Sequence, residues 1–199
     1  MGAHKKAWYV INGITLYRIA AAPVLLLLLY TGQYIIFKWL LGVSFFTDLI
    51  DGYLARKFKV TSVMGTRLDS IGDDLTVLTA MIGLFVIKPA FIQQQKTVLI
   101  ILFALFAVET GYAFFRYGKM TGFHTYLAKT AALLQGIFLL LVFFTSEPSL
   151  FLFFAAAIIT MLQLTEEIIL IWMLPKWESN VKGIYQVLKK KKQAEQELI

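Results

Sequence analysis

Aspartates are the residues of this sequence whose types and spacing point most clearly to chemistry. Asp48 and Asp51 lie three residues apart, which places both carboxylates on one face of a helix. Asp69 and Asp73, four residues apart, share a face in the same way. If these helices are neighbours, four carboxylates meet and need divalent cations such as Mg²⁺, Mn²⁺ or Ca²⁺ to offset their repulsion. A pair of such ions suits phosphoryl transfer, because the ions stabilise the charged oxygens of the displacement.

Small residues and one cation accompany these acids. Gly52 adjoins the second aspartate, Ala55 continues the same small face, and Gly65 lies one turn before the third aspartate. Small side chains in a helix let a neighbouring helix or a ligand approach the backbone closely. Arg56 adds a guanidinium at the edge of this face, where it can bind a phosphate group.

The composition is that of a membrane protein. The chain has 199 residues, of which 59% are hydrophobic and only 16% are charged. The absence of cysteine excludes a disulfide framework and thiolate metal sites. The net charge of +7 is concentrated in part in the lysine run 189–192. That run fits anionic lipid headgroups or a solvated tail that fixes orientation, and it argues against nucleic acid as a partner.

Six apolar segments are long enough to cross a bilayer, which needs roughly 20 residues per helix. We therefore predict an all-α integral membrane protein with six transmembrane helices, in a single domain spanning 1–199 that ends in a basic tail at about 176–199. The connections between the segments are short, and no internal repeat is evident. The predicted segments are 12–31, 34–56, 65–88, 97–117, 126–145 and 149–174.

Lysine and arginine predict the orientation, because cytoplasmic loops are enriched in them. The N-terminus, the second and fourth connections and the tail are basic, whereas the opposite side carries few cations. Both termini are thus expected in the cytoplasm, and the aspartates at the cytoplasmic ends of the second and third helices. The localisation expected is a bacterial-type inner membrane, with the site facing the cytoplasm.

The aspartate segment resembles the signature of the CDP-alcohol phosphotransferases, also called CDP-alcohol phosphatidyltransferases. Its order of Asp-x-x-Asp-Gly-x-x-Ala-Arg, eight residues, Gly, three residues, Asp, three residues, Asp agrees at every fixed position from Asp48 to Asp73. The nearest likeness is to bacterial phosphatidylglycerophosphate synthases. The alternative reading is structural, with the acids paired to Arg56, Lys57 or Arg67 to hold helices together. Asp74 lies outside the signature and has no assigned role.

The resemblance implies transfer of a phosphatidyl group from CDP-diacylglycerol to a small alcohol, with release of CMP. It implies two Mg²⁺ or Mn²⁺ ions as cofactors, a homodimer, and membrane lipids as surroundings. Carried over by motif position, the metal ligands are Asp48, Asp51, Asp69 and Asp73, of which Asp73 is also the general base. The same carry-over assigns the CDP pocket to Gly52, Ala55, Arg56 and Gly65.

The first apolar segment contributes two further candidates for the CDP site. Asn12, Thr15 and Arg18 recur every three residues and look like the Asn-x-x-Thr-x-x-Arg opening of several bacterial members of the family. Alternatively, Asn12 or Thr15 caps the helix and Arg18 extends toward the membrane interface.

The acceptor alcohol is expected near the fourth connection. Arg116, Lys119 and Lys129 form a basic group that suits a phosphorylated acceptor, with glycerol 3-phosphate as the first expectation. The element around Lys129 only partly resembles that of phosphatidylglycerophosphate synthases, because Ala128, Ala131 and Ala132 replace its glycine, second lysine and threonine. Inositol phosphate, inositol and serine remain alternative acceptors, and positive-inside topology remains an alternative reason for these cations.

A second class of function fits the same acids. A divalent-cation transporter would also place carboxylates inside a membrane. Grouping of the acids at one membrane face, rather than along a pathway, favours the enzyme. Three further acids lie in apolar segments and have no predicted role: Glu109, Glu166 and Glu167.

Overall fold

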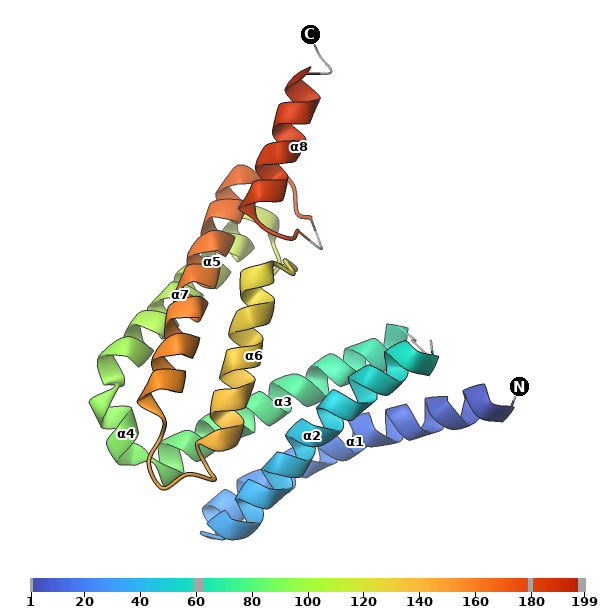
Figure 1. Ribbon diagram of the computed structural model, residues 1–199, viewed down its shortest axis with the longest axis vertical. Helices are drawn as coiled ribbons and strands as arrows, with labels where there is room; N and C mark the ends of the chain where they lie inside the picture. Colours follow the sequence, from blue (N-terminus) through green and yellow to red (C-terminus); the bar gives the residue numbers. More distant parts are fainter. Residues whose placement is uncertain (1, 59–62, 179–180, 197–199) are drawn as a thin grey trace. The chain divides into compact units, whose positions relative to one another are not determined.

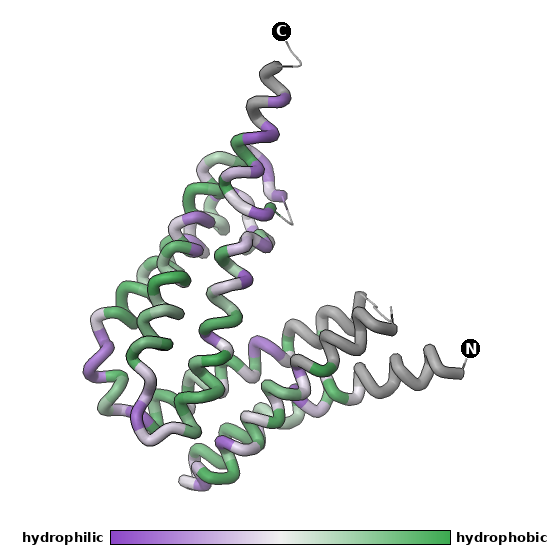
Figure 2. The backbone as a smooth tube through the Cα atoms, in the orientation of Figure 1, coloured by the Kyte–Doolittle hydropathy of each residue, from purple (hydrophilic) through white to green (hydrophobic). Residues whose placement is uncertain are grey.

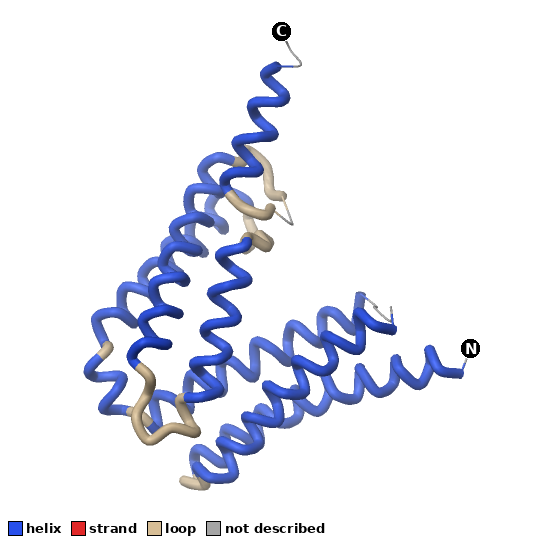
Figure 3. The backbone as a smooth tube through the Cα atoms, in the orientation of Figure 1, coloured by secondary structure: helices blue, strands red, loops and turns tan. Residues whose placement is uncertain are grey.

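The computed structural model describes the backbone of residues 2–58, 63–178 and 181–196, and this part of the chain is helical without strands (Figures 1 and 3). Side chains are described except those of residues 2–12, 49, 51–58, 63–67, 69–70, 191–192 and 194–196. The helices are α1 (Gly2–Tyr30), α2 (Tyr34–Phe58), α3 (Val63–Ile87), α4 (Pro89–Gln94), α5 (Lys96–Tyr117), α6 (Tyr126–Leu141), α7 (Leu150–Met173) and α8 (Ile184–Gln196).

Each of the six predicted segments corresponds to a helix, so the all-helical prediction is confirmed. The largest differences are at α1, which begins at Gly2 rather than residue 12, and at α6, which ends at Leu141 rather than residue 145. Hydropathy marks where a segment is apolar, whereas a helix continues into polar sequence as long as the backbone hydrogen bonds do. The short helix α4 and the basic helix α8 were not predicted.

Among the described residues, three helices are long and apolar enough to cross a membrane. They contain the segments Gly13–Tyr30, Lys96–Tyr117 and Leu150–Met173, and the apolar helix α6 is shorter. Their length and composition are those of an integral membrane protein. Six spans and cytoplasmic termini remain predictions.

The chain divides into two compact units, Met1–Ile92 with Leu139–Pro148, and Gln93–Phe138 with Ser149–Ile199. We call them unit 1 and unit 2. In unit 1, helix α1 packs against both α2 and α3 (Figure 1). In unit 2, helix α7 packs against α5 and contacts α8. The prediction of one domain over 1–199 stays a prediction.

The core of unit 1 is closed by aromatic packing around one glycine. Phe37 is fully buried, and its ring meets that of Phe143 edge-on with the ring centroids 5.4 Å apart. A Cβ atom at Gly83 would lie 2.5 Å from the Phe37 ring, so only glycine fits at this place in α3.

The apolar residues of unit 2 lie along α5, α6 and α7, and hydrophilic residues gather at α8 (Figure 2). One buried cluster joins these three helices, through Ala113 of α5, Leu170 and Ile171 of α7, and Val187 of α8. The tail helix is therefore part of the packed structure of unit 2.

Candidate active site

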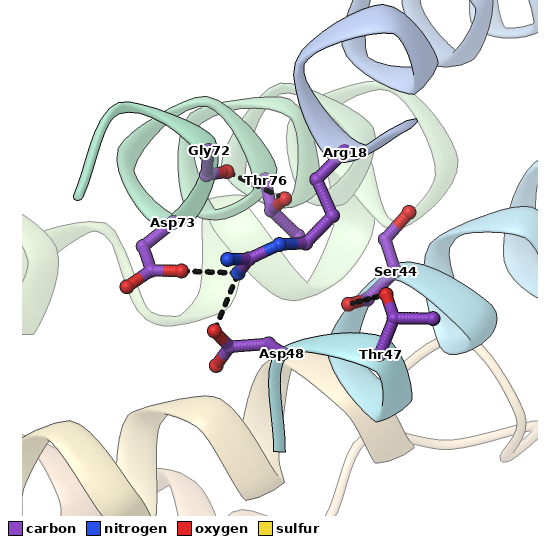
Figure 4. Close-up of polar contacts among 7 residues, drawn as sticks. All are labelled: Arg18, Ser44, Thr47, Asp48, Gly72, Asp73 and Thr76. Atoms are coloured by element: carbon purple, nitrogen blue, oxygen red, sulfur yellow. Dashed lines mark hydrogen bonds and ion pairs between the residues drawn. The ribbon is translucent and has the colours of Figure 1, made fainter. Parts of the chain in front are cut away.

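Three helices of unit 1 meet at the side chain of Arg18. Its Nη1 nitrogen in α1 donates hydrogen bonds to Asp48 Oδ1 of α2 and to Asp73 Oδ1 of α3 (Figure 4). Two carboxylates from different helices thus contact one nitrogen atom. The i,i+3 and i,i+4 spacing predicted an acidic face on each of α2 and α3, and a meeting of the acids if the two helices are neighbours. It did not predict that Arg18 would lie between them.

Exposure differs sharply between the guanidinium and the acids that it contacts. The Arg18 side chain is 0% exposed, whereas the side chains of Asp48 and Asp73 are 39% and 43% exposed. Thr15, one turn before Arg18 on the same face of α1, is also buried. The cationic group of the site is therefore buried, and its two carboxylates are partly exposed.

Small and hydroxyl residues line the helices around this cluster (Figure 4). A Cβ atom at Gly72 would lie 3.6 Å from the Arg18 guanidinium, which shows how closely α3 approaches that side chain. The Thr76 hydroxyl donates to Gly72 O at 2.8 Å, and the Ser44 hydroxyl donates to Leu40 O at 3.1 Å. These hydroxyls donate within their own helices, a common arrangement for Ser and Thr in a helix.

The remaining signature residues lie on the same two helices. The backbone of Asp51, Gly52, Ala55 and Arg56 belongs to α2, and that of Gly65 and Asp69 to α3, but their side chains lie outside the described residues. Within the described part, no group of three or more acidic or histidine side chains gathers that could hold a metal ion. Asp74, next to Asp73, is exposed.

Carboxylate oxygens such as those of Asp48 and Asp73 are the type of ligand that a divalent cation prefers. Two oxygens that both hydrogen-bond to one nitrogen lie no more than about 6 Å apart. Ligands of one Mg²⁺ or Ca²⁺ ion lie 2.0–2.6 Å from the metal, so one ion binds both oxygens only when the Arg18 guanidinium moves from between them. When both carboxylates are ionised, they outnumber the single guanidinium between them, which leaves a negative charge for a cation to neutralise.

The three cationic residues predicted to bind the acceptor lie in unit 2, and so do the residues that they contact. Arg116 donates to the carbonyl oxygen of Leu174 at 3.2 Å, near the end of α7. Lys119 Nζ lies 3.6 Å from the centroid of the Trp177 ring, and Lys129 Nζ lies 5.9 Å from that of Tyr126. All three side chains are exposed.

A second polar cluster, which the sequence did not predict, lies inside unit 2. The Thr121 hydroxyl lies 2.9 Å from Glu109 Oε1 and 3.2 Å from Glu167 Oε2, and both glutamates are buried. Gln163 donates to the other oxygen of Glu167 at 2.7 Å. Three acids in apolar segments of the sequence are a signal of such a cluster, but nothing in the sequence indicates that Thr121 joins two of them.

Sequence similarity points in the same direction as this geometry. The profile of the CDP-alcohol phosphatidyltransferase family matches residues 8–174, which include Arg18, Asp48 and Asp73, all of α2 and α3, and α1 from residue 8 onward. No solved structure matches the chain.

Several similar proteins have names that state an activity. A CDP-diacylglycerol–glycerol-3-phosphate 3-phosphatidyltransferase of Rickettsia bellii is 34% identical over 129 residues, which cover 62% of this chain and 68% of that protein. A Pseudomonas fluorescens protein of the same name is 32% identical over 74 residues, or 36% and 38% of the two chains. A Schizosaccharomyces pombe cardiolipin synthase (CMP-forming)/mitochondrial hydrolase fusion protein is 40% identical over 73 residues, or 35% and 12%.

Proposed function

Because this chain belongs to the CDP-alcohol phosphatidyltransferase family, a family of transferases of phospholipid biosynthesis, we propose that it moves a phosphatidyl group from CDP-diacylglycerol to glycerol 3-phosphate and releases CMP. The names of the similar Rickettsia bellii and Pseudomonas fluorescens proteins support this donor and acceptor. The observation that carries the proposal is that two partly exposed carboxylates, Asp48 and Asp73, meet at Arg18 within the residues that match the family.

The acids are proposed to hold the metal ions. The family is generally metal-dependent, and hard oxygen ligands favour Mg²⁺ or Mn²⁺. Asp48 and Asp73 would hold the metal from α2 and α3, and Asp51 and Asp69 would complete the ligand set. When bound, the ions would neutralise charge on the pyrophosphate of the donor.

Asp73 is proposed as the general base. Its half-exposed carboxylate can reach an acceptor hydroxyl that enters from water. In this reaction Asp73 takes the hydroxyl proton as the acceptor oxygen attacks the phosphorus that carries the diacylglycerol. A new oxygen–phosphorus bond forms, the bond between this phosphorus and the bridging oxygen breaks, and CMP leaves with that electron pair.

Arg18 is proposed to bind the donor phosphates from its buried position beside the two acids. Its guanidinium is fully buried and reaches the same point as both carboxylates, so an anionic group held among the acids by metal would lie beside it. Thr15 lies on the same face of α1. The rest of the CDP pocket is proposed to consist of Gly52, Ala55, Arg56 and Gly65.

The phosphate of the acceptor is proposed to bind Arg116, Lys119 and Lys129. Their exposed cationic groups are available to a dianion, and a guanidinium can hold a phosphate through two parallel hydrogen bonds. A homodimer in a bacterial-type inner membrane, with the site and both termini on the cytoplasmic side, is part of the same proposal.

The test is CMP release by the purified protein with CDP-diacylglycerol and single acceptors. Glycerol 3-phosphate is expected to support turnover, and inositol phosphate, inositol and serine are the competing acceptors. Asp73→Asn should lower the rate of CMP release by at least about 100-fold, because general-base catalysis contributes a factor of this size. Asp74→Asn is the matched control, since Asp74 is exposed and outside the signature.

Two results would contradict the proposal. One is full turnover by the Asp73→Asn protein or in excess chelator, and the other is no CMP release with any acceptor. In that second case a liposome flux assay tests the divalent-cation transporter, which predicts metal flux that does not depend on CDP-diacylglycerol.

A further inference from the structure

The tail helix α8 forms a basic surface at the end of unit 2, away from the Arg18 cluster in the sequence. The docked part of the tail begins at Val181, before the helix, and the lysine run 189–192 lies within the helix. The chain after residue 175 contains six lysines against three glutamates. No role in the proposed reaction uses these lysines.

The start of α8 is fixed to α7 by packing and by one hydrogen bond. Val181 and Val187 are buried in the cluster that contains Leu170 and Ile171 of α7. The backbone N–H of Ile184, the first residue of α8, donates to Glu166 Oε1 at 3.3 Å. A carboxylate at a helix N-terminus is stabilised by the helix dipole and by an otherwise unpaired N–H group.

This attachment sets the depth of the lysines in the membrane. Val187 packs against the last turn of α7, which is the end of an apolar segment long enough to span a bilayer. Each helical residue adds 1.5 Å, so the run 189–192 lies within about 8 Å of the level of Val187 however α8 is tilted. The headgroup layer on each side of the hydrocarbon core is about 5–8 Å thick. With α7 across the bilayer and α8 directed away from its core, the backbone of this run lies at headgroup depth.

The face of α8 opposite the docked Val187 combines apolar and basic side chains. Tyr185, Leu188 and Lys189 recur at i, i+3 and i+4, and Tyr185 and Leu188 are 78% and 46% exposed. Lys190 is also exposed. An aromatic and an aliphatic side chain beside lysines are typical of helices that lie at a lipid–water interface.

We propose that this face of α8 binds the headgroups of anionic phospholipids in the surrounding bilayer. Lysines beside a membrane are attracted by the negative surface potential, and the exposed Tyr185 and Leu188 insert among the acyl chains next to them. A soluble polyanion such as RNA would leave these two side chains in water, so the bilayer is the better partner. This binding is independent of the proposed reaction and of its acceptor.

The test uses the absence of cysteine from the chain. A single Gln193→Cys substitution at an exposed position of α8 carries a polarity-sensitive fluorophore on the full-length protein. The protein is placed in nanodiscs of phosphatidylcholine, with or without about one third phosphatidylglycerol. Quenching by neutral acrylamide should fall at least about twofold in the anionic discs and recover in high salt, since salt screens this attraction.

The comparison variant replaces the lysine run 189–192 by glutamine and should show equal quenching in both kinds of disc. Lys96→Gln, an exposed lysine at the start of α5, is the matched control and should behave as the parent protein. Equal quenching of the parent protein in both discs would overturn the proposal. So would protection that persists without the lysines, or stronger protection by a soluble RNA in phosphatidylcholine discs. If the glutamine variant does not fold, the salt titration of the parent protein gives the same decision.

Discussion

Asp48 of α2 and Asp73 of α3 accept hydrogen bonds from the same nitrogen atom, Nη1 of Arg18. Like charges so close together repel unless a cation lies between them. Arg18 supplies that cation in the protein described here, and it joins α1, α2 and α3 at one point. The carboxylate pair consequently has two possible partners, the guanidinium and a divalent metal.

Removal of the guanidinium should destabilise unit 1. Breaking a buried ion pair costs about 3–5 kcal/mol, but both acids are partly exposed here, so we expect about 1–3 kcal/mol for Arg18→Ala. The measurement is thermal unfolding in detergent without divalent metal. Lys96→Ala, at an exposed position, should change stability by no more than about 0.5 kcal/mol. Equal effects of the two substitutions would show that the Arg18 contacts contribute nothing.

Divalent metal should stabilise the protein through the same acids. A ligand that binds only the folded state at 100 times its dissociation constant stabilises by about 2.7 kcal/mol, so Mg²⁺ should raise the unfolding temperature. Asp48→Asn should remove most of this increase, and Asp74→Asn should keep it. The Arg18→Ala protein should gain more from Mg²⁺ than the parent, because the metal replaces the missing cation. An Mg²⁺ effect that is unchanged in Asp48→Asn would place the metal elsewhere.

Gly83 should be intolerant of any side chain. A Cβ atom there would lie 2.5 and 2.9 Å from the ring of Phe37, which is fully buried and would have to shift within packed surroundings. Overpacking of this kind costs about 1–3 kcal/mol, which we expect for Gly83→Ala in an unfolding experiment. Gly111→Ala is the matched control, since nothing lies within 4 Å of its Cβ and alanine favours a helix by up to about 1 kcal/mol. The prediction fails if both variants are equally stable.

Thr121 should contribute to stability through the buried acids of unit 2. Thr121→Val removes the hydroxyl that contacts both Glu109 and Glu167 and leaves a buried oxygen on each without that partner. An unsatisfied buried group costs about 1–3 kcal/mol, and a loss in this range is expected. Thr130→Val is the control, because that hydroxyl is exposed and bonds only to Tyr126 O of its own helix. A loss of less than about 0.5 kcal/mol for Thr121→Val would contradict this role.

Local spacing predicted part of the candidate site. Four aspartates at helical intervals indicated that α2 and α3 present acids on one face each, and Asp48 and Asp73 do meet. The apolar segments likewise predicted the positions of the helices, because their lengths and boundaries are local properties of the sequence.

Contacts that depend on how helices rotate against one another were beyond the reach of the sequence. Arg18 lies far from both acids along the chain, and its place between them follows from the packing of α1 on α2 and α3. The joining of Glu109 and Glu167 through Thr121 depends on α5 and α7 packing together and on the loop after α5. Helix α8 was not predicted because its lysines make the tail hydrophilic, although Val181 and Val187 pack against α7.

The buried position of Arg18 behind the half-exposed carboxylates has a kinetic consequence. In the proposed orientation, an ion that approaches from water meets the carboxylates first and reaches the guanidinium only after passing them. A cation is attracted at this entrance, whereas a nucleotide carrying a pyrophosphate is repelled until the entrance has been neutralised. We therefore expect compulsory-order binding in initial-rate measurements, with the metal ion first and the CDP-linked donor second.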